Sequence, residues 1–138
     1  MTVRLQGQGV TEGEAEGVAL VTRQAIAFNL GVDERTGLVI EKGHELEGQL
    51  IAGKILVFPG GKGSTASSFS LLQLASLGLG PTALVNLQSD AIIAAGAVLA
   101  AIPLVHRCTK SPIDSIKSGD WVRVNGTTGI VEILRAAS

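Results

Sequence analysis

The residues best suited to chemistry form a run of glycines and hydroxyl side chains that follows an apolar segment. The run reads Gly60-Gly61-Lys62-Gly63-Ser64-Thr65, and two more serines, Ser67 and Ser68, come just after it. Glycine lets the backbone turn sharply, and the first turn of a helix leaves unpaired N–H groups that favour negative charge. A hydroxyl held at such a helix start loses its proton more readily than one in water. We therefore expect any chemistry of this chain to take place at this turn.

Three interpretations of the turn can be weighed from its residues. A nucleoside-triphosphate loop needs Ser or Thr directly after Gly-Lys, and here Gly63 follows Lys62, which excludes it. Residues 61–66 fit the Gly-x-Gly-x-x-Ala fingerprint of dinucleotide binders, although Asn86 stands where that motif expects an acid. A plain strand-to-helix turn, capped by Ser64 or Thr65, is the third. The second and third stay open, but four hydroxyls within five positions exceed what capping needs.

The segments around the turn predict a parallel βαβαβ unit. Compact apolar segments indicate strands, and helical apolar spacing indicates helices between them. The strands are expected at residues 54–58, 83–86 and 103–105, and the helices at residues 67–77 and 91–101. Ser89-Asp90 is a capping pair for the second helix. Right-handed crossovers make the three strands parallel neighbours.

The flanking segments favour β-structure. Short strands are expected at residues 3–5 and 18–21, and residues 121–124 and 130–134 pair as a hairpin around a glycine-containing turn. Residues 29–50 show little periodicity; a turn at 33–37 precedes a short strand at 38–40. A long irregular segment in a small domain is usually either mobile or functional.

The composition predicts one folded domain over residues 1–138. Hydrophobic residues make up 46% of the chain and charged residues 17%, the opposite of the balance in disordered segments. The net charge is −1 with both signs interspersed, which favours neither nucleic acid nor a membrane surface as a partner. Glu12, Glu14 and Glu16 are interpreted as a solvated face rather than a metal cluster.

No membrane or export segment is expected. The longest apolar run, residues 91–105, is interrupted by Gly96 and Pro103 and falls short of a bilayer-spanning helix. The first residues lack the apolar stretch of a secretory signal, so the sequence predicts a cytoplasmic protein. A single cysteine, Cys108, fits that compartment.

Four segments of this chain resemble the small subunit of aconitase X. They lie in the same order over nearly the whole chain: Gly-Val-Asp-Glu-Arg-Thr-Gly (31–37), Lys-Gly-His-Glu-Leu-Glu-Gly (42–48), Ile-Ala-Gly-Lys-Ile-Leu-Val-Phe-Pro-Gly-Gly-Lys-Gly-Ser-Thr (51–65) and Ala-Ala-Gly-Ala-Val-Leu-Ala-Ala-Ile-Pro-Leu-Val (94–105). The resemblance implies an α/β fold of the swivelling β/β/α type, the counterpart of the mobile fourth domain of aconitase. Such a domain closes over an iron–sulfur or iron site held by a separate large subunit.

The resemblance also implies an activity. Aconitase X enzymes are hydro-lyases, and two substrates are known in the family: cis-3-hydroxy-L-proline in bacteria and mevalonate 5-phosphate in archaea. Because the charged segments here are ordinary and a phosphate needs several cationic partners, we expect a dehydratase subunit for cis-3-hydroxy-L-proline that is active only with its large subunit. Phosphomevalonate dehydration is the alternative. A non-catalytic swivel or binding module is the alternative of another class, although phosphohistidine swivel domains need a histidine where Ser64 stands.

In the resemblance, the serine base of the swivel domain corresponds to Ser64. Lys62 stands where the family pattern has Arg, and Asn29-Leu30 stands where it has two small residues. We expect Gly61, Lys62, Gly63 and Thr65 to shape the pocket for the oxyanion and the substrate carboxylate, and His44 to orient substrate or close the interface. The chain offers no metal ligand set, because Cys108 is alone and the two histidines, His44 and His106, are far apart in sequence. The metal is therefore expected in the large subunit.

Overall fold

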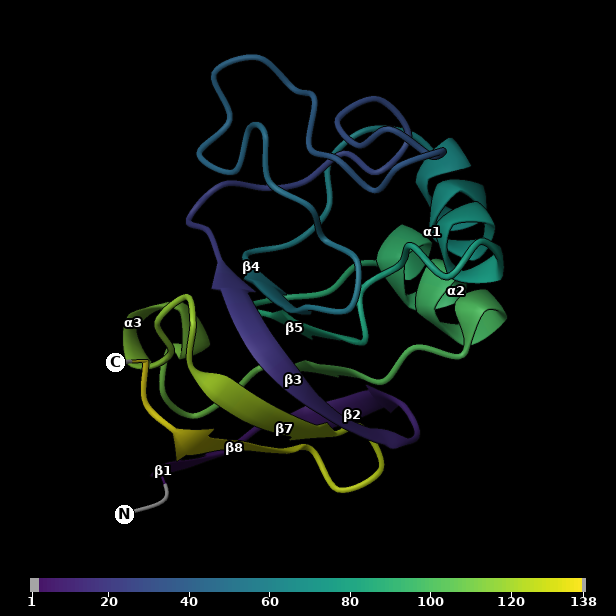
Figure 1. Ribbon diagram of the computed structural model, residues 1–138. Helices are drawn as coiled ribbons and strands as arrows, with labels where there is room; N and C mark the ends of the chain where they lie inside the picture. Colours follow the sequence, from purple (N-terminus) through teal and green to yellow (C-terminus); the bar gives the residue numbers. More distant parts are fainter. Residues whose placement is uncertain (1–2, 138) are drawn as a thin grey trace.

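The computed structural model describes residues 3–137, which form an eight-stranded mixed sheet with helices packed against part of it (Figure 1). The strand order is β1-β8-β7-β3-β4-β5-β6-β2. The elements are β1 (Val3–Gln6), β2 (Gln8–Thr11), β3 (Glu14–Val21), β4 (Ile55–Phe58), α1 (Ala66–Ser76), β5 (Ala83–Asn86), α2 (Ala91–Ala100), β6 (Leu104–His106), α3 (Pro112–Ser115), β7 (Trp121–Asn125) and β8 (Ile130–Arg135).

The central strands confirm the predicted βαβαβ unit. β4, β5 and β6 run parallel to one another, and α1 and α2 connect them on one face of the sheet. Ser68 lies where the two helices cross, and its hydroxyl donates a hydrogen bond of 2.6 Å to the carbonyl of Ile92. Gly96 allows this close packing, because a Cβ there would lie 3.0 Å from the Cα of Ser68. The carboxyl ends of the parallel strands therefore meet the starts of both helices at one edge.

The antiparallel part of the sheet packs against the other face of the parallel strands. β7 and β8 form the predicted hairpin, β1 pairs with β8, and the long strand β3 joins the two parts by pairing with β7 and then with β4. Side chains of β4 alternate between two cores: Leu56 and Phe58 face the helices, whereas Ile55 and Val57 face the antiparallel strands. The result is the expected layered arrangement of sheet, sheet and helices.

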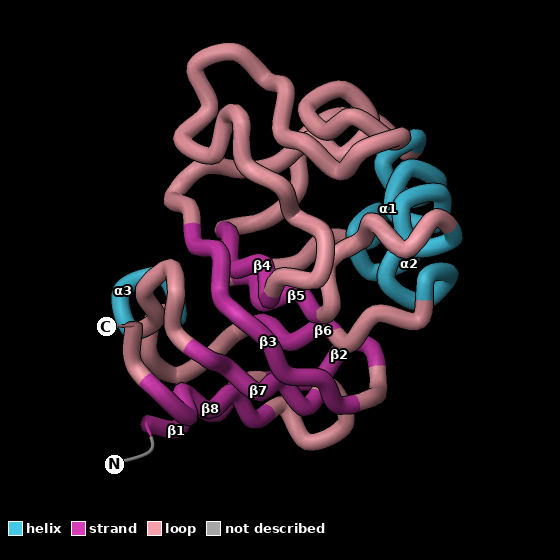
Figure 2. The backbone as a smooth tube through the Cα atoms, in the orientation of Figure 1, coloured by secondary structure: helices cyan, strands magenta, loops and turns pink. Residues whose placement is uncertain are grey.

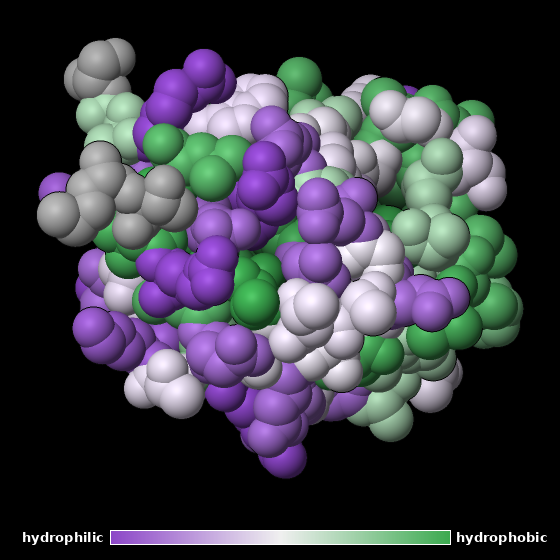
Figure 3. Space-filling view, turned by 90° about the horizontal axis from the view of Figure 1, so that it is seen from below, coloured by the Kyte–Doolittle hydropathy of each residue, from purple (hydrophilic) through white to green (hydrophobic). Residues whose placement is uncertain are grey.

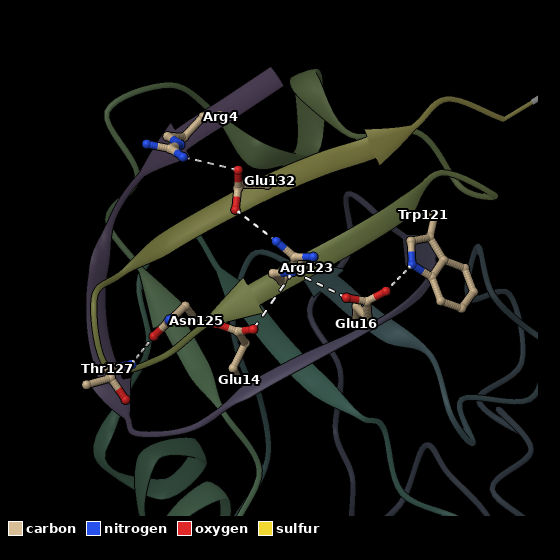
Figure 4. Close-up of polar contacts among 8 residues, drawn as sticks. All are labelled: Arg4, Glu14, Glu16, Trp121, Arg123, Asn125, Thr127 and Glu132. Carbon is tan, nitrogen blue, oxygen red and sulfur yellow. Dashed lines mark hydrogen bonds and ion pairs between the residues drawn. The ribbon is translucent and has the colours of Figure 1, made fainter. Parts of the chain in front are cut away.

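The outer face of the antiparallel strands carries a network of exposed ion pairs (Figure 4). Glu16 accepts hydrogen bonds from the Trp121 indole at 2.8 Å and from Arg123 at 3.2 Å, and these bonds lower the pKa of its carboxyl. Glu14 also faces Arg123, at 3.9 Å. This arrangement confirms the interpretation of Glu14 and Glu16 as a solvated face. In a view from below, hydrophilic side chains gather over these strands and apolar ones over the side where the helices lie (Figure 3).

Residues 22–54 form a long irregular connection above the sheet, drawn as loop in Figure 2. Its backbone is held by hydrogen bonds such as that from the N–H of Val39 to the carbonyl of Gln49, at 2.9 Å. Six of its apolar side chains enter the core that the parallel strands share with the helices: Ile26, Phe28, Val32, Val39, Leu46 and Ile51. The connection is therefore an ordered part of the domain, and it lies over the carboxyl end of β4.

Three elements differ from the sequence expectation. The predicted strand at 38–40 was wrong, because Leu38 and Val39 form only isolated bridges to Leu50 and Val32. β2 and the short helix α3 were not expected. β2 has little apolar patterning, and α3 is a single turn that starts with the cap Ser111 and Pro112. Within residues 3–137, no helix has the length and apolar character needed to cross a membrane.

Candidate functional site

The glycine–serine turn joins the buried strand β4 to α1, as expected. It is fixed on one side by the long connection, because Gly61 pairs with Ile26 and the N–H of Lys62 donates to the carbonyl of Ile26 at 3.1 Å. Gly61 lies close to α2, since a Cβ there would lie 2.7 Å from the side chain of Ile93. The turn is thus held between the connection and the start of α2.

Ser64 presents an exposed hydroxyl that receives two N–H donors. Its Oγ accepts a hydrogen bond from Nδ2 of Asn29 at 3.1 Å and one from the backbone N–H of Ala66 at 3.3 Å. Thr65 is the N-cap of α1, and its side chain makes no cap hydrogen bond, so the contact from Ala66 to Ser64 is a local turn bond one residue before the cap. Two N–H donors aimed at one oxygen stabilise negative charge on it, which is what an alkoxide requires.

Asn29 is a site residue that sequence reasoning missed. It appeared only as a departure from the family pattern, and nothing in the sequence ties it to a serine 35 positions away. In the structure its Oδ1 accepts a hydrogen bond of 3.0 Å from the hydroxyl of Ser67, which is buried in the first turn of α1. The three side chains form a chain of hydrogen bonds from Ser67 through Asn29 to Ser64.

Lys62 lies beside the same turn and is paired with an acid from the long connection. Its Nζ is 2.8 Å from Oε2 of Glu41, and both side chains are partly exposed. Glu41 had not been identified from the sequence, because it is one of many acids in an aperiodic segment. A partly exposed pair contributes little to stability, but it fixes where the cation sits.

A hollow of about 40 Å³, open to solvent, lies beside the turn. Ser64 and Asp90 both line this hollow. Asp90 is the N-cap of α2, and its Oδ1 accepts a hydrogen bond from the N–H of Ile93 at 2.9 Å. Thr65 is outside the lining. The full lining is Gly61, Lys62, Gly63, Ser64, Ser67, Asp90, Ile92 and Ile93. A hollow of this size is smaller than typical small-molecule pockets and far too small to enclose a dinucleotide.

His44 lies away from this hollow and is engaged by the backbone at both ring nitrogens. Its Nδ1 accepts a hydrogen bond from the N–H of Leu46 at 3.0 Å, so Nε2 carries the proton and donates to the carbonyl of Ala25, also at 3.0 Å. The side chain is buried. His44 therefore anchors the long connection, and this geometry gives no support to a role in orienting substrate.

Polar groups at the ends of β5 and β6 serve mainly to tie the strands together. The buried Asn86 donates to the carbonyl of Phe58 at 3.2 Å, and Nδ1 of His106 accepts from the N–H of Ser89 at 3.0 Å. Desolvation and the neighbouring Arg107 lower the pKa of His106, and burial raises the pKa of the Cys108 thiol. Over the described range, residues 3–137, no group of three or more His, Cys, Asp or Glu side chains is placed to hold a metal ion.

Comparisons with known proteins agree on one family. The family model described as "Aconitase X swivel domain" matches residues 4–133. The chain is 46% identical over 131 residues to the phosphomevalonate dehydratase small subunit of Methanocella arvoryzae, covering 95% of this chain and 99% of the relative. It is 45% identical over 133 residues to the protein of that name from Methanosarcina acetivorans, covering 96% and 92%. The crystal structure of holo-form aconitase X from Thermococcus kodakaraensis matches with a TM-score of 0.91 at 39% identity, over 96% of this chain and 99% of that one.

Proposed function

The chain belongs to the aconitase X swivel-domain family, and we propose that, as the small subunit of an aconitase-X-type hydro-lyase, it supplies Ser64 as the general base that dehydrates mevalonate 5-phosphate. The main support for this proposal is the environment of the Ser64 hydroxyl. It is exposed beside an open hollow, and two N–H groups already point at its oxygen.

The dehydration needs a base for a weakly acidic proton. Mevalonate 5-phosphate carries a hydroxyl on the carbon next to the one that bears the carboxylate. Ser64, as the alkoxide, takes a proton from the carbon beside the carboxylate, and the electrons of that C–H bond form the double bond as the neighbouring C–O bond breaks. The departing hydroxide combines with the proton that Ser64 has taken up and leaves as water, which returns Ser64 to its alkoxide form. The side-chain N–H of Asn29 and the backbone N–H of Ala66 hold the alkoxide before the substrate arrives.

The substrate carboxylate is assigned to the cationic side of the turn. Lys62 lines the hollow and is held there by Glu41, and Gly61 and Gly63 let the backbone approach closely. An ammonium group attracts an anion as a point charge and lacks the two-pronged grip of arginine. Thr65, next to Ser64 but outside the lining, stays a predicted neighbour of the substrate.

The choice of mevalonate 5-phosphate over cis-3-hydroxy-L-proline is supported by the names of the relatives, which are phosphomevalonate dehydratase small subunits. The expectation of hydroxyproline depended on the ordinary charge pattern of this chain. That argument applies to one subunit alone, because the cationic groups for a phosphate can come from the large subunit. Both substrates carry a hydroxyl on the carbon next to the one that bears the carboxylate, so the same base can serve either.

The rest of the active site is assigned to the large subunit. The hollow beside Ser64 is small and open, as expected for one wall of a site that a second polypeptide completes. From the family resemblance we place an iron–sulfur cluster or iron in the large subunit, and among residues 3–137 no group of three or more His, Cys, Asp or Glu side chains competes for that role. The departure of the hydroxyl group is assigned to the same subunit.

Co-expression of the chain with its large subunit, followed by assays of both substrates, tests this function. We expect water loss from mevalonate 5-phosphate, no turnover of cis-3-hydroxy-L-proline, and no activity from either subunit alone. Turnover of cis-3-hydroxy-L-proline without turnover of mevalonate 5-phosphate would overturn the substrate assignment. Full activity of the large subunit alone would overturn the role of this chain in the reaction.

A further inference from the structure

The side chain of Asn29 lies between two serines of the turn, and each end of its amide has a different partner. Its Nδ2 donates to Ser64 at 3.1 Å, and its Oδ1 accepts from Ser67 at 3.0 Å. We propose that Asn29 is the positioning residue of the reaction, which holds the Ser64 oxygen in place and stabilises its alkoxide. This proposal rests on the assignment of Ser64 as the base.

Ser67 fixes which end of the amide faces Ser64. Only 2% of Ser67 is exposed, so its hydroxyl needs a protein acceptor, and Oδ1 of Asn29 supplies one. With the carbonyl oxygen occupied, the NH₂ group of the amide is the end that reaches Ser64. The amide therefore presents a donor, and a donor favours the charged form of the serine oxygen.

Gly63 makes room for this contact. A Cβ at position 63 would lie 2.9 Å from Oδ1 of Asn29, and the backbone there has φ +106°, a conformation that side-chain-bearing residues rarely adopt. Gly63 is therefore needed for two independent reasons. Its backbone has a positive φ, and the amide of Asn29 lies directly against it.

The backbone of Asn29 is anchored to the strand that leads into the turn. Its neighbour Phe28 is fully buried, and the ring of Phe28 packs edge-on against that of Phe58, the last residue of β4, with centroids 5.8 Å apart. The N–H of Gly31 also donates to the carbonyl of Ala27 at 2.6 Å, which closes a turn around Asn29. Both ends of the Asn29–Ser64 bond are thus tied to the same core, so their separation does not depend on a mobile loop.

The two donors leave one direction of the serine oxygen free. A hydroxyl oxygen accepts through two lone pairs and donates through one O–H. At Ser64 the N–H groups of Asn29 and Ala66 occupy the two acceptor directions, so the hydroxyl proton points in the third direction. Once that proton is lost, the electron pair left in the third direction takes up the substrate proton. Asn29 thereby sets the direction of the base as well as its charge.

The test uses the complex with the large subunit and mevalonate 5-phosphate. Asn29→Asp keeps the shape of the side chain but replaces the donor with a carboxylate, and Asn29→Ala removes it. We expect kcat to fall about 10- to 100-fold in Asn29→Ala and further in Asn29→Asp, with KM changed less than about threefold. Ser67→Ala, which frees the amide to turn, should lower kcat in the same direction but less.

The pH profile separates positioning from mere structural support. Loss of the donor disfavours the alkoxide, so the ascending limb of log kcat against pH should move to higher pH in both Asn29 variants. The charged groups around the hollow, Lys62, Glu41 and Asp90, are unchanged in these variants. Asn125→Asp, on the antiparallel strands, is the matched control and should leave kcat and the pH profile as in the unsubstituted protein.

The outcomes distinguish this proposal from the one on which it rests. Near-normal turnover of Ser64→Ala would overturn the role of Ser64 as the base. An inactive Ser64→Ala together with Asn29→Asp at wild-type kcat would overturn only the role of Asn29. A lower melting temperature of Asn29→Ala with unchanged kcat per assembled complex and an unmoved pH profile would also overturn it, because Asn29 would then be purely structural.

Discussion

Nζ of Lys62 lies 2.8 Å from Oε2 of Glu41, a contact that joins the glycine turn to the long connection between β3 and β4. The pair keeps a positive charge beside the hollow that Ser64 lines. The long connection thus contacts the turn twice, because it places Glu41 beside the cation of Lys62 and Asn29 beside the hydroxyl of Ser64.

Replacing Lys62 tests its proposed contact with the substrate carboxylate. Lys62→Met should raise KM for mevalonate 5-phosphate about tenfold or more, because a hydrogen bond to a charged group contributes about 1.5–3 kcal/mol. Lys62→Arg keeps the charge and should stay within severalfold of the unsubstituted protein. The matched control is Lys42→Met, an exposed lysine of the connection. Equal KM values for Lys62→Met and Lys42→Met would remove Lys62 from the site.

Gly63 and Gly78 form a matched pair of glycines with left-handed backbone. Both have positive φ, +106° and +72°, but only Gly63 has a neighbour that a Cβ would strike. Each change to alanine should cost about 1 kcal/mol of unfolding free energy from backbone strain. Gly63→Ala should also lower kcat about tenfold or more by displacing Asn29 from Ser64. Equal kcat for the two variants, measured on complexes of equal subunit content, would contradict the account of the turn.

The pKa of His106 predicts a stability change in mild acid. Because desolvation and Arg107 lower this pKa in the folded state, the unfolded chain binds the proton more readily, near the ordinary value of 6.5. The stabilisation is complete above that value and is lost as the pH falls below it. Protonation of Nδ1 would also remove the bond from the N–H of Ser89. Urea unfolding at pH 7.5 and 5.5 should show a smaller loss of stability in His106→Gln than in the unsubstituted protein, and an equal loss would refute this.

The thiol of Cys108 should react slowly in the folded protein. Burial raises its pKa above the ordinary value of 9.0, so the thiolate, which is the reactive form, is scarce near pH 8. The reaction with a disulfide reagent should be slower in the native chain than in urea at the same pH. A native rate equal to the unfolded rate would show that the thiol is freely accessible.

The part of the fold that follows local pattern was predictable from sequence. The strands and helices of the βαβαβ unit and the C-terminal hairpin have clear apolar spacing and turn residues, and the structure confirms them. The strand expected at 38–40 was wrong because Leu38 and Val39 form only isolated bridges, and Val39 is apolar because its side chain enters the core beneath the helices and parallel strands. β2 could not be found from pattern, because pairing with β6 at the sheet edge defines it.

Sequence reasoning found the part of the candidate site that lies in the glycine–serine turn, but not the contacts that the long connection makes. Gly61, Lys62, Gly63 and Ser64 are consecutive, so their types and order are visible in the sequence, and all four line the hollow. Asn29 bonds to a serine 35 positions away, and its neighbour Phe28 packs on Phe58, so this contact depends on the folded core. The same limit applies to His44, whose two backbone partners cannot be seen in a string of residues.

The most direct test of the central claim is the turnover of Ser64→Ala in the complex with the large subunit. A general base contributes about 10²- to 10⁴-fold to the rate, so kcat for mevalonate 5-phosphate should fall at least about 100-fold while KM changes little. Ser76→Ala, a serine at the far end of α1 that bonds only to the carbonyl of Leu72, is the control and should keep full activity. A Ser64→Ala complex that retains more than about a tenth of the wild-type kcat would contradict the account.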